Sequence, residues 1–337
     1  MKVTIERAAL LKALAHAQSV VERRNTIPIL ANIRLAAEDG KLSLTATDMD
    51  LSIVEETEVA VAGAGATTAP AHMLYDIARK LPEGAQVELD STAKDGQLTL
   101  RAGRSTFGLA SLPEEEFPVL AGGEQGHTFK VAARDLRSLI DRARFAISTE
   151  ETRYYLNGIY LHEAENEGVA VLRAVATDGH RLARVEIPLP EGAAGMPGVI
   201  VPRKAVGEVR KLLDDATDEV QVTVSETKIH FVFGPVELTS KLIDGTFPDY
   251  QRVIPQGNDK TLAVDCQAFR EAVDRVATIS TERSRAVKLA IDDNTLTLSA
   301  SSADSGTANE ELEVEYGAGA MEIGFNARYL LDIAQQI

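Results

Sequence analysis

Asp178 and His180 stand on either side of a glycine, and a carboxylate beside an imidazole is a pairing that can move protons. No serine or cysteine nucleophile motif accompanies the pair, and Asp-Gly is itself a strong tight-turn signal. We therefore interpret His180 as the wall of a binding groove rather than as a catalyst. Two alternatives stay open: a structural histidine at the end of a strand, and a hydrolase or small-molecule-binding protein that uses the Asp178/His180 cleft.

The residue patterns that hold cofactors or metals do not occur in this sequence. Gly63-Ala-Gly65 is not followed by the third glycine of a dinucleotide-binding fingerprint, and there is no Gly-Lys-Thr/Ser phosphate loop. Cys266 is the single cysteine, and the six histidines lack metal-ligand spacing. We interpret the acidic run Glu114-Glu-Glu116 as a solvated loop rather than a cation site. No cofactor, no metal and no enzymatic activity are expected.

The composition is typical of a globular protein of the cytoplasm. The chain has 337 residues, 45% of them hydrophobic, which suffices for two or three domains with cores of their own. A lone cysteine forms no intrachain disulfide, no signal segment precedes Lys2-Val-Thr-Ile5, and no run of about 18 apolar residues occurs. These features predict a reducing compartment and no membrane span. The net charge of −16, taken alone, argues against a nucleic-acid partner.

The positive charge is concentrated in the segments with helical periodicity. Residues 7–24, 71–81, 134–147, 203–213, 266–279 and 326–337 contain 17 Lys/Arg and 8 Asp/Glu, so they carry +9 and the rest of the chain −25. Solvated helix faces are the ordinary explanation, but the bias recurs in the first two of the repeats described next. We expect basic helices on a surface that meets phosphates without reading bases, and an acidic exterior. A purely structural oligomer with no DNA role stays an alternative.

The same succession of elements occurs three times. In residues 152–184, an alternating strand is followed by an acidic turn and by a second strand that ends in Ala176-Thr-Asp178. Residues 29–48 repeat this pattern and end in Ala46-Thr-Asp48, and residues 286–302 end in Ala300-Ser-Ser302. A helix precedes each strand pair and another follows it. A period of about 125 residues indicates three similar domains rather than a solenoid.

The repeats predict an α+β fold in which each domain packs two helices on antiparallel sheets. We place the domains at residues 1–121, 127–255 and 261–337, with linkers at 121–127 and 255–260. The third copy stops after its second helix, so we expect that domain to be truncated at its C-terminus. Six helices about 10 Å apart would close a ring only about 20 Å across, whereas twelve leave room for a duplex. This geometry favours a ring of two chains joined head to tail.

Six stretches, in order along the chain, resemble the bacterial DNA polymerase III beta subunit, the sliding-clamp family. They are Thr26-Ile-Pro-Ile-Leu30, Arg153-Tyr-Tyr-Leu-Asn-Gly158, Ala176-Thr-Asp-Gly-His-Arg-Leu182, Val201-Pro-Arg-Lys204, Asp244-Gly-Thr-Phe-Pro-Asp-Tyr250 and Met321-Glu-Ile-Gly-Phe-Asn326. That family forms ring-shaped dimers of three similar domains per chain, encircles double-stranded DNA and tethers the replicative polymerase. The resemblance implies a clamp that confers processivity, with a clamp loader, the polymerase alpha subunit and other clamp-binding-motif proteins as partners.

The resemblance also implies which residues touch DNA. The matching positions are Arg24, His72, Glu150, Tyr154, Tyr155, Arg203 and Lys204. His72 and Glu150 depart from the arginine and the glutamine that are usual there, which weakens the expected DNA contact. For the two tyrosines, a half-buried place in a strand is the alternative.

Two protein-binding surfaces follow from the same resemblance. A partner-peptide groove would be lined by Arg153, Tyr155, Leu156, Thr177, Gly179, His180, Leu182, Pro248, Arg252 and Val253, with Asn326 and Tyr329 at its edge. Leu182, Pro248 and Val253 would supply its apolar wall. At the dimer interface, Phe107 and Leu109 would meet Thr278 and Ile279 of the other chain. Arg104 and Glu310 would remain from a thinned set of ion pairs, so apolar burial is expected to dominate there.

Overall fold

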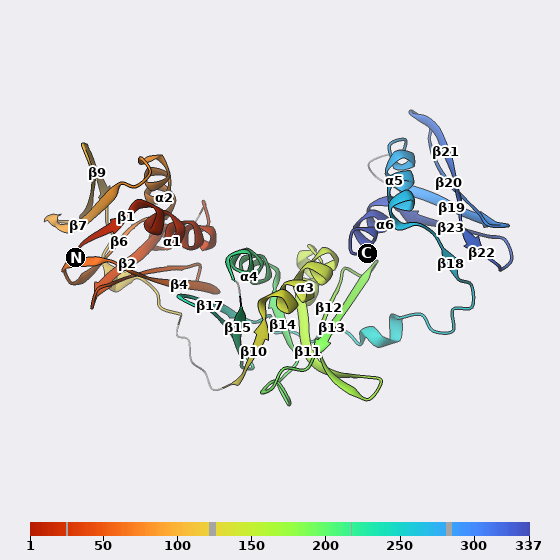
Figure 1. The fold of residues 1–337 in the computed structure, drawn as a ribbon, viewed down its shortest axis with the longest axis horizontal. Coiled ribbons are helices and arrows are strands. Elements are labelled where there is room, and N and C mark those ends of the chain that lie inside the picture. The colour runs from red at the N-terminus through yellow and green to blue at the C-terminus, as the bar shows by residue number, and fades with distance from the viewer. Residues whose placement is uncertain (25, 121–125, 217, 281–284) are drawn as a thin grey trace. The chain divides into compact units, whose positions relative to one another are not determined.

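The structure is a computed structural model of residues 1–337 that describes all of them except residues 25, 121–125, 217 and 281–284 (Figure 1). Most of the linker expected at 121–127 therefore lies outside the described residues. The chain divides into two compact units, Met1–Phe247 and Pro248–Ile337, and each is described by itself. Within the described residues, no helix combines the length and the apolar composition that crossing a membrane requires.

The first repeat begins with a strand that runs directly into a helix. Its elements are β1 (Lys2–Glu6), α1 (Arg7–Val20), the 3₁₀ turn η1 (Pro28–Ala31), β2 (Asn32–Glu38), β3 (Lys41–Thr47), β4 (Leu51–Glu58), β5 (Ala60–Gly63), β6 (Gly65–Pro70), α2 (Ala71–Lys80), β7 (Gln86–Lys94), β8 (Gln97–Ala102), β9 (Ser105–Ala110) and η2 (Glu114–Glu116). The Glu6 carboxylate accepts hydrogen bonds from the backbone N–H groups of Ala8 and Ala9 and so starts α1. Leu10 and Leu14 recur at helical spacing and are fully buried.

The second repeat follows a similar order, with two short 3₁₀ turns after its first helix and one strand fewer between its two helices. Its elements are β10 (His127–Ala132), α3 (Ala133–Ala143), η3 (Arg144–Ala146), η4 (Glu151–Leu156), β11 (Gly158–Asn166), β12 (Val169–Thr177), β13 (Leu182–Pro188), β14 (Val199–Pro202), α4 (Arg203–Asp215), β15 (Glu219–Val224), β16 (Lys228–Phe233) and β17 (Val236–Lys241). The helix expected over 134–147 thus ends at Ala143 and continues as a 3₁₀ turn.

Antiparallel sheets join the first two repeats into one unit. The strand orders are β5-β1-β7-β8-β9, β13-β12-β11-β14 and, in an eight-stranded sheet, β10-β15-β16-β17-β4-β3-β2-β6. The eight-stranded sheet crosses from the second repeat to the first where β17 pairs with β4, with Val236 opposite Glu55 and Ser240 opposite Leu51. Sequence analysis did not predict β4 or β13, the strands that follow each Thr-Asp turn.

The four helices of this unit form a row. Helix α1 packs on α2, α3 packs on α4, and α1 contacts α4, so the order in the row is α2, α1, α4, α3 (Figure 1). Their apolar faces close a core that includes Leu35, Leu74, Leu89, Leu139 and Leu213. The opposite faces of the helices are left for charged side chains.

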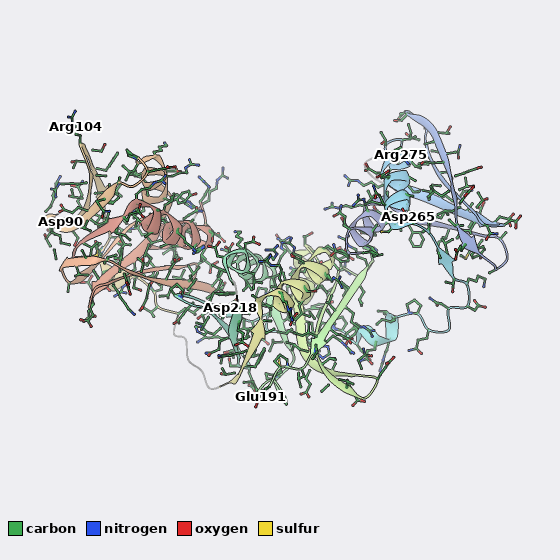
Figure 2. All side chains as sticks on the ribbon, viewed as in Figure 1. Asp90, Arg104, Glu191, Asp218, Asp265 and Arg275 are labelled. Atoms are coloured by element: carbon green, nitrogen blue, oxygen red, sulfur yellow. The ribbon has the colours of Figure 1, made fainter. Side chains whose placement is uncertain are left out.

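The second unit repeats the pattern on a smaller scale. Its elements are η5 (Tyr250–Val253), β18 (Leu262–Ala263), α5 (Cys266–Ala277), β19 (Ala286–Asp292), β20 (Thr295–Ser302), β21 (Gly306–Glu313), β22 (Glu315–Tyr316), β23 (Met321–Asn326) and α6 (Ala327–Ala334). The strands β21-β20-β19-β23 form one antiparallel sheet, and β18 pairs with β22. Helix α5, which Asp265 caps at its N-terminus (Figure 2), packs on α6 over a separate core around Val273, Leu296 and Leu298.

Candidate DNA-facing surface and peptide groove

Four arginines of the helix row are exposed and have no ionic partner among the described residues. Arg23 and Arg24 follow the end of α1, Arg142 lies in the last turn of α3, and Arg203 opens α4. In the part of the chain that the structure describes, no carboxylate lies within ion-pair distance of any of the four. A guanidinium without a carboxylate partner is available for a phosphate, which it binds with two parallel hydrogen bonds.

Most other cations of the row are neutralised within the chain. Arg210 in α4 donates from Nε to both oxygens of Asp141, at 2.7 and 2.9 Å, and from Nη1 to Asp214 at 2.6 Å. Lys12 lies 3.0 Å from Asp215, and Lys211 lies 2.8 Å from Glu208. The basic helices counted in the sequence therefore present less free positive charge than their composition predicts.

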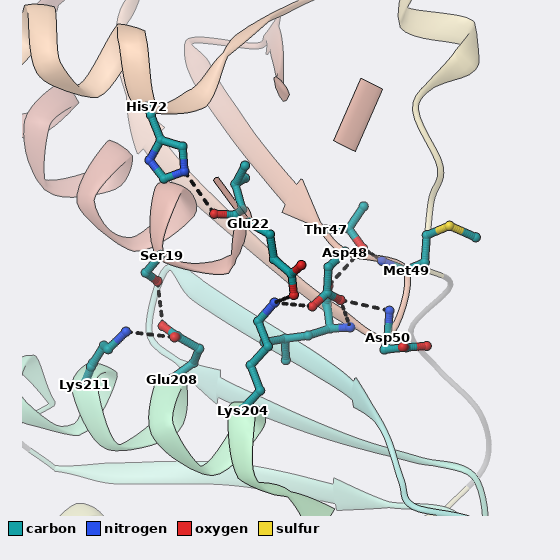
Figure 3. A network of polar contacts seen from close by, with 12 residues as sticks. Ser19, Glu22, Thr47, Asp48, Met49, Asp50, His72, Lys204, Glu208 and Lys211 are labelled. Carbon is teal, nitrogen blue, oxygen red and sulfur yellow. Dashed lines mark hydrogen bonds and ion pairs between the residues drawn. The ribbon is translucent and has the colours of Figure 1, made fainter. Parts of the chain in front are cut away.

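Lys204, which is expected to touch DNA, is part of a polar network between the first two repeats (Figure 3). Its Nζ hydrogen-bonds to Asp48 and lies 3.1 Å from Glu22, and 35% of the side chain is exposed. Burial lowers the pKa of Lys204, but the Asp48 and Glu22 carboxylates outweigh this effect and raise it above the ordinary value. Beside it, Ser19 of α1 donates to the buried Glu208 of α4 at 2.6 Å. The Lys204 charge serves the junction of the repeats, whereas its neighbour Arg203 is more exposed.

His72 and Glu150 also have partners inside the chain. The His72 ring, shown in Figure 3, has Nε2 3.0 Å from the Val21 carbonyl oxygen and Nδ1 2.9 Å from Gln18 Oε1, so it ties α2 to α1. Glu150 accepts from Arg153 Nε at 2.8 Å and lies 2.7 Å from its Nη2. The Arg153 guanidinium holds the pKa of the Glu150 carboxyl below its ordinary value. Neither side chain adds a free positive charge to the row.

Tyr154 and Tyr155 lie in the 3₁₀ turn η4, so the alternative that placed them in a strand is wrong. The turn forms because the Asn157 N–H bonds to the Tyr154 carbonyl at 2.9 Å and the Ser148 N–H to the Leu156 carbonyl at 3.1 Å. Tyr154 is 53% exposed, and its ring meets Tyr155 edge to face with centroids 5.8 Å apart. Tyr155 packs so closely over Gly245 that a Cβ there would lie 3.1 Å from the Tyr155 Cβ. Tyr154 is therefore the tyrosine with exposed surface for a ligand.

The loop between β12 and β13, residues 177–182, is built by its own side chains. Thr177 Oγ1 donates to the Arg181 carbonyl at 2.7 Å and accepts from the Gly179 N–H at 3.1 Å. Asp178 Oδ1 accepts from the backbone N–H groups of His180 and Arg181 at 2.9 and 3.0 Å, and Oδ2 accepts from Arg181 Nε at 3.1 Å. These bonds give Asp178 a structural task and leave Gly179 and His180 exposed.

The first repeat contains a loop of the same construction. Thr47 Oγ1 donates to the Leu51 carbonyl at 2.9 Å, and Asp48 Oδ1 accepts from the N–H groups of Asp50 and Leu51 at 2.9 and 2.7 Å. Met49 has φ +80° where Gly179 has φ +87°. In the first repeat, the remaining Asp48 oxygen binds Lys204, so the loop closes the junction of the repeats. Glu22 and Asp48 were missed by sequence analysis, although the matching Thr-Asp sequences of copies one and two mark this loop.

Of the expected groove residues of the first unit, Arg153 lies against loop 177–182, and the loop itself contains Thr177, Gly179, His180 and Leu182. Arg153 Nη1 would lie only 2.5 Å from a Cβ at Gly179, so the guanidinium covers the glycine. Thr177 and Leu182 are half-buried, whereas Leu156 is buried in the chain's own interior at 4% exposure. The structure thus brings Arg153, Gly179 and His180 to one exposed place.

The expected groove residues of the second unit lie in or near η5 and at the start of α6. Pro248 and Val253 are exposed, Val253 to 69%, and Arg252 Nε lies 2.8 Å from Asp249. Asn326 caps α6 by accepting from the Arg328 N–H at 2.9 Å, and Tyr329 is half-buried in the same helix. Asn326 therefore has a structural task in addition to any role in binding.

The residues expected at the dimer interface differ in accessibility. Phe107 of β9 is half-buried beside a depression of about 560 Å³ that His72, Met73, Ile77 and Leu81 also line. Leu109 is 3% exposed and belongs to its own core, so it offers little surface to another chain. Arg104 is exposed at the turn before β9 (Figure 2). Thr278 is exposed and Ile279 half-buried, whereas Glu310 is engaged by Arg275 of its own chain at 2.6 Å.

The architecture defines a class: three repeats of two helices against antiparallel sheets form a three-domain DNA clamp fold. Family models of the DNA polymerase III beta subunit match residues 1–121 for the N-terminal domain, 130–249 for the central domain and 251–337 for the C-terminal domain. The beta sliding clamp of Caulobacter vibrioides (strain NA1000 / CB15N) is 56% identical over 337 residues, which are 100% of this chain and 91% of that protein.

Solved structures agree with these matches. A DNA polymerase III subunit beta sliding clamp from Bartonella birtlesii bound to griselimycin gives a TM-score of 0.97 at 51% identity, over 100% of this chain and 90% of that one. A Pseudomonas aeruginosa sliding clamp bound to griselimycin gives 0.93 at 40% identity with the same coverage. The chain belongs to the DNA polymerase III beta subunit family. The expected family and the α+β class with three similar domains are confirmed.

Proposed function

We propose that this protein is the sliding clamp of a bacterial replicase, a dimeric ring that encircles duplex DNA and tethers DNA polymerase III. The proposal rests on the row of helices α2, α1, α4 and α3. In or beside these helices, Arg23, Arg24, Arg142 and Arg203 are exposed and have no ionic partner within the described part of the chain. Guanidinium groups on helix faces bind phosphates of any sequence, so the ring slides. The acidic remainder of the chain disfavours DNA binding elsewhere.

The DNA contacts that we propose differ in part from those expected by resemblance. Arg24, Arg203 and Tyr154 are exposed, and Arg23 and Arg142 join them. His72, Glu150 and Lys204 are already bonded within the chain, so we assign them no primary DNA contact. Few contacts of one sign, screened by salt, suit a protein that has to hold DNA and yet move along it.

The second activity that we propose is the capture of partner peptides without any catalysis or cofactor. Loop 177–182, Arg153 and the half-buried Leu182 form its part of the first unit. Pro248, Arg252, Val253, Asn326 and Tyr329 remain proposed groove residues because of the family resemblance. The relatives bound to griselimycin support a ligand-binding surface in this family. The polymerase alpha subunit, a clamp loader and other replication and repair proteins of the cytoplasm are the proposed partners, and 1–121, 127–255 and 261–337 the proposed domains.

Native mass tests the ring. Light scattering over a micromolar dilution series should give twice the 36.3 kDa of one chain. Phe107→Asp places a charge in the proposed apolar contact and should shift this equilibrium toward the single chain. A monomer at every concentration in the unaltered protein would remove the stable dimeric ring.

A further inference from the structure

Arg153 is poised beside loop 177–182 but is occupied by a neighbouring carboxylate. Two of its nitrogens, Nε and Nη2, meet the two oxygens of Glu150 at 2.8 and 2.7 Å. The third nitrogen, Nη1, lies against Gly179. The Arg153 side chain is 32% exposed and that of Glu150 54% exposed, so solvent and ligands reach both.

The loop itself has few donors left for an incoming acceptor. The N–H groups of Gly179, His180 and Arg181 are all used by Thr177 and Asp178. The Arg181 guanidinium is 11% exposed, bonds to Asp178 and lies over the Phe145 ring at 5.3 Å from its centroid. Among the described arginines beside this loop, Arg153 is therefore the cation that a ligand can reach.

We propose that Arg153 receives a carboxylate of the partner peptide, and that Glu150 is an internal competitor which the peptide has to displace. The inference rests on the proposed groove and specifies its ligand: a peptide with apolar anchors and an aspartate or glutamate placed beside them. Glu150 thereby sets specificity, since it screens Arg153 from weakly anchored anions. The guanidinium donates two parallel hydrogen bonds to either carboxylate, so the exchange needs no change of the backbone.

Displacement is feasible because both members of the internal pair are open to solvent. Exposed ion pairs gain little over solvated charges, and water competes for both partners. A peptide carboxylate that apolar anchors already hold near Arg153 acts at a high effective concentration. Glu150 thus reduces the affinity for acidic peptides by a modest factor rather than blocking them.

The test uses pairs of synthetic peptides. Both members of a pair carry two apolar anchors, and one has an aspartate where its twin has an asparagine. The position of this residue along the peptide is varied from pair to pair. Glu150→Gln keeps the shape but removes the competing charge. At its best position, the aspartate peptide should bind this variant roughly 2- to 5-fold tighter than the unaltered protein, while the asparagine twin changes little. Glu151→Gln is the matched control, because Glu151 is an exposed neighbour without an ionic partner among the described residues.

A third variant is Arg153→Gln. With it, the aspartate peptide and its asparagine twin should bind with similar affinities. If Glu150→Gln and Glu151→Gln changed the affinity for the aspartate peptide equally, the effect would come from the overall charge of this surface. The proposed competition would then be wrong. An unchanged acid preference in Arg153→Gln would contradict it as well. If neither twin bound the unaltered protein at any position, the proposed groove itself would be wrong, an outcome distinct from binding without competition.

Discussion

At the residue scale, Gly179 shows how one backbone angle creates a binding place. Its φ of +87° is strained for any residue with a Cβ, and the Arg153 guanidinium occupies the position that a Cβ would take. In the first repeat, Met49 adopts a similar angle, φ +80°, and its side chain is 48% exposed. The glycine is therefore required by Arg153 as well as by the turn.

Replacing Gly179 should separate these two requirements. Gly179→Ala and the control Gly168→Ala, at φ +80° in open space, should each lose about 1 kcal/mol of stability from backbone strain. Only Gly179→Ala pushes Arg153 off the loop, so only this variant should bind acidic partner peptides several-fold more weakly. Urea unfolding followed by circular dichroism and peptide titration measure the two effects. Equal peptide affinities of the two variants would contradict the role of the contact.

Asp90 should make stability depend on pH in the acid range. The side chain, labelled in Figure 2, accepts from the hydroxyl and N–H of Thr92 at 2.7 and 2.8 Å, and Lys2 lies 3.4 Å away. These donors lower the pKa of Asp90 from 3.8 to about 2. Because the folded pKa is the lower one, the stabilisation is present above about pH 4 and disappears as the pH falls toward 2.

Asp90→Asn measures that contribution. The variant should lose about 2 kcal/mol at pH 6, and its deficit should shrink between about pH 4 and pH 2.5. Asp95→Asn, at an exposed turn of the same sheet, is the control and should show no such change. A deficit for Asp90→Asn that stays constant over this pH range would show that the hydrogen bonds do not favour the ionised form.

At the element scale, the junction of the first two repeats combines a continuous sheet with the Lys204 network. β17 pairs with β4, the Lys204 ammonium joins Asp48 and Glu22, and Lys241 Nζ lies 3.0 Å from Asp50. Asp48 has only 12% of its side chain exposed, so loss of its cation leaves a nearly buried charge. Helix α4 thereby keeps its place beside α1 in the row.

Two adjacent residues of α4 should therefore give opposite results. Lys204→Met should cost about 1–3 kcal/mol of stability, because it strips Asp48 of its partner. Arg203→Met should change stability by less than about 0.5 kcal/mol, since Arg203 is exposed. Arg203→Met should instead lower the salt dependence of DNA affinity by about one released counterion, whereas Lys204→Met should leave the salt dependence unchanged. A larger loss of salt dependence in Lys204→Met would return Lys204 to the DNA contacts.

These elements also show what local sequence can and cannot predict. The helices and most strands were predictable because apolar residues such as Leu10 and Leu14 recur with the period of the element. The turn η4 was not predicted. Its two adjacent tyrosines are typical of a strand, and the turn depends on hydrogen bonds from the N–H groups of Ser148 and Asn157. Strands β4 and β13 were missed because Leu51 and Leu182 follow directly on the Thr-Asp loops.

The candidate site was predictable only where the backbone decides it. Asp178 and Gly179 predict their loop, because an Asp-Gly pair favours a tight turn. Lys204 is different, because a lysine at the start of a helix serves a phosphate or a carboxylate equally well, and Asp48 lies 156 positions away in the chain. Which group a long charged side chain contacts depends on the fold, so the contact cannot be predicted from the local sequence.

At the scale of the whole molecule, the net charge of −16 is compatible with a DNA-binding function. The positive charge is concentrated in the helical segments and the negative charge in the rest of the chain. Carboxylates neutralise many helix cations, such as Arg210 and Lys211, and a few arginines have no carboxylate partner in the described ranges. DNA affinity should consequently be weak and fall steeply with salt, so that retention depends on encirclement. Partner capture depends on a separate surface.

Leu182→Asp should separate partner capture from assembly. Leu182 begins β13 beside the exposed loop 177–182, and a carboxylate there removes apolar surface that a peptide would cover. The variant should lose detectable binding of a polymerase-derived peptide while its native mass stays that of the unaltered protein. Retained peptide affinity would remove Leu182 from the groove.

The central claim is that the protein holds DNA by topology, and linearisation tests it most directly. The protein, loaded by a clamp loader and ATP onto nicked circular plasmid, is separated by gel filtration before and after a single restriction cut. The protein should elute with circular DNA at moderate salt and should be released once the plasmid is linear. Equal retention on circular and linear DNA would contradict encirclement.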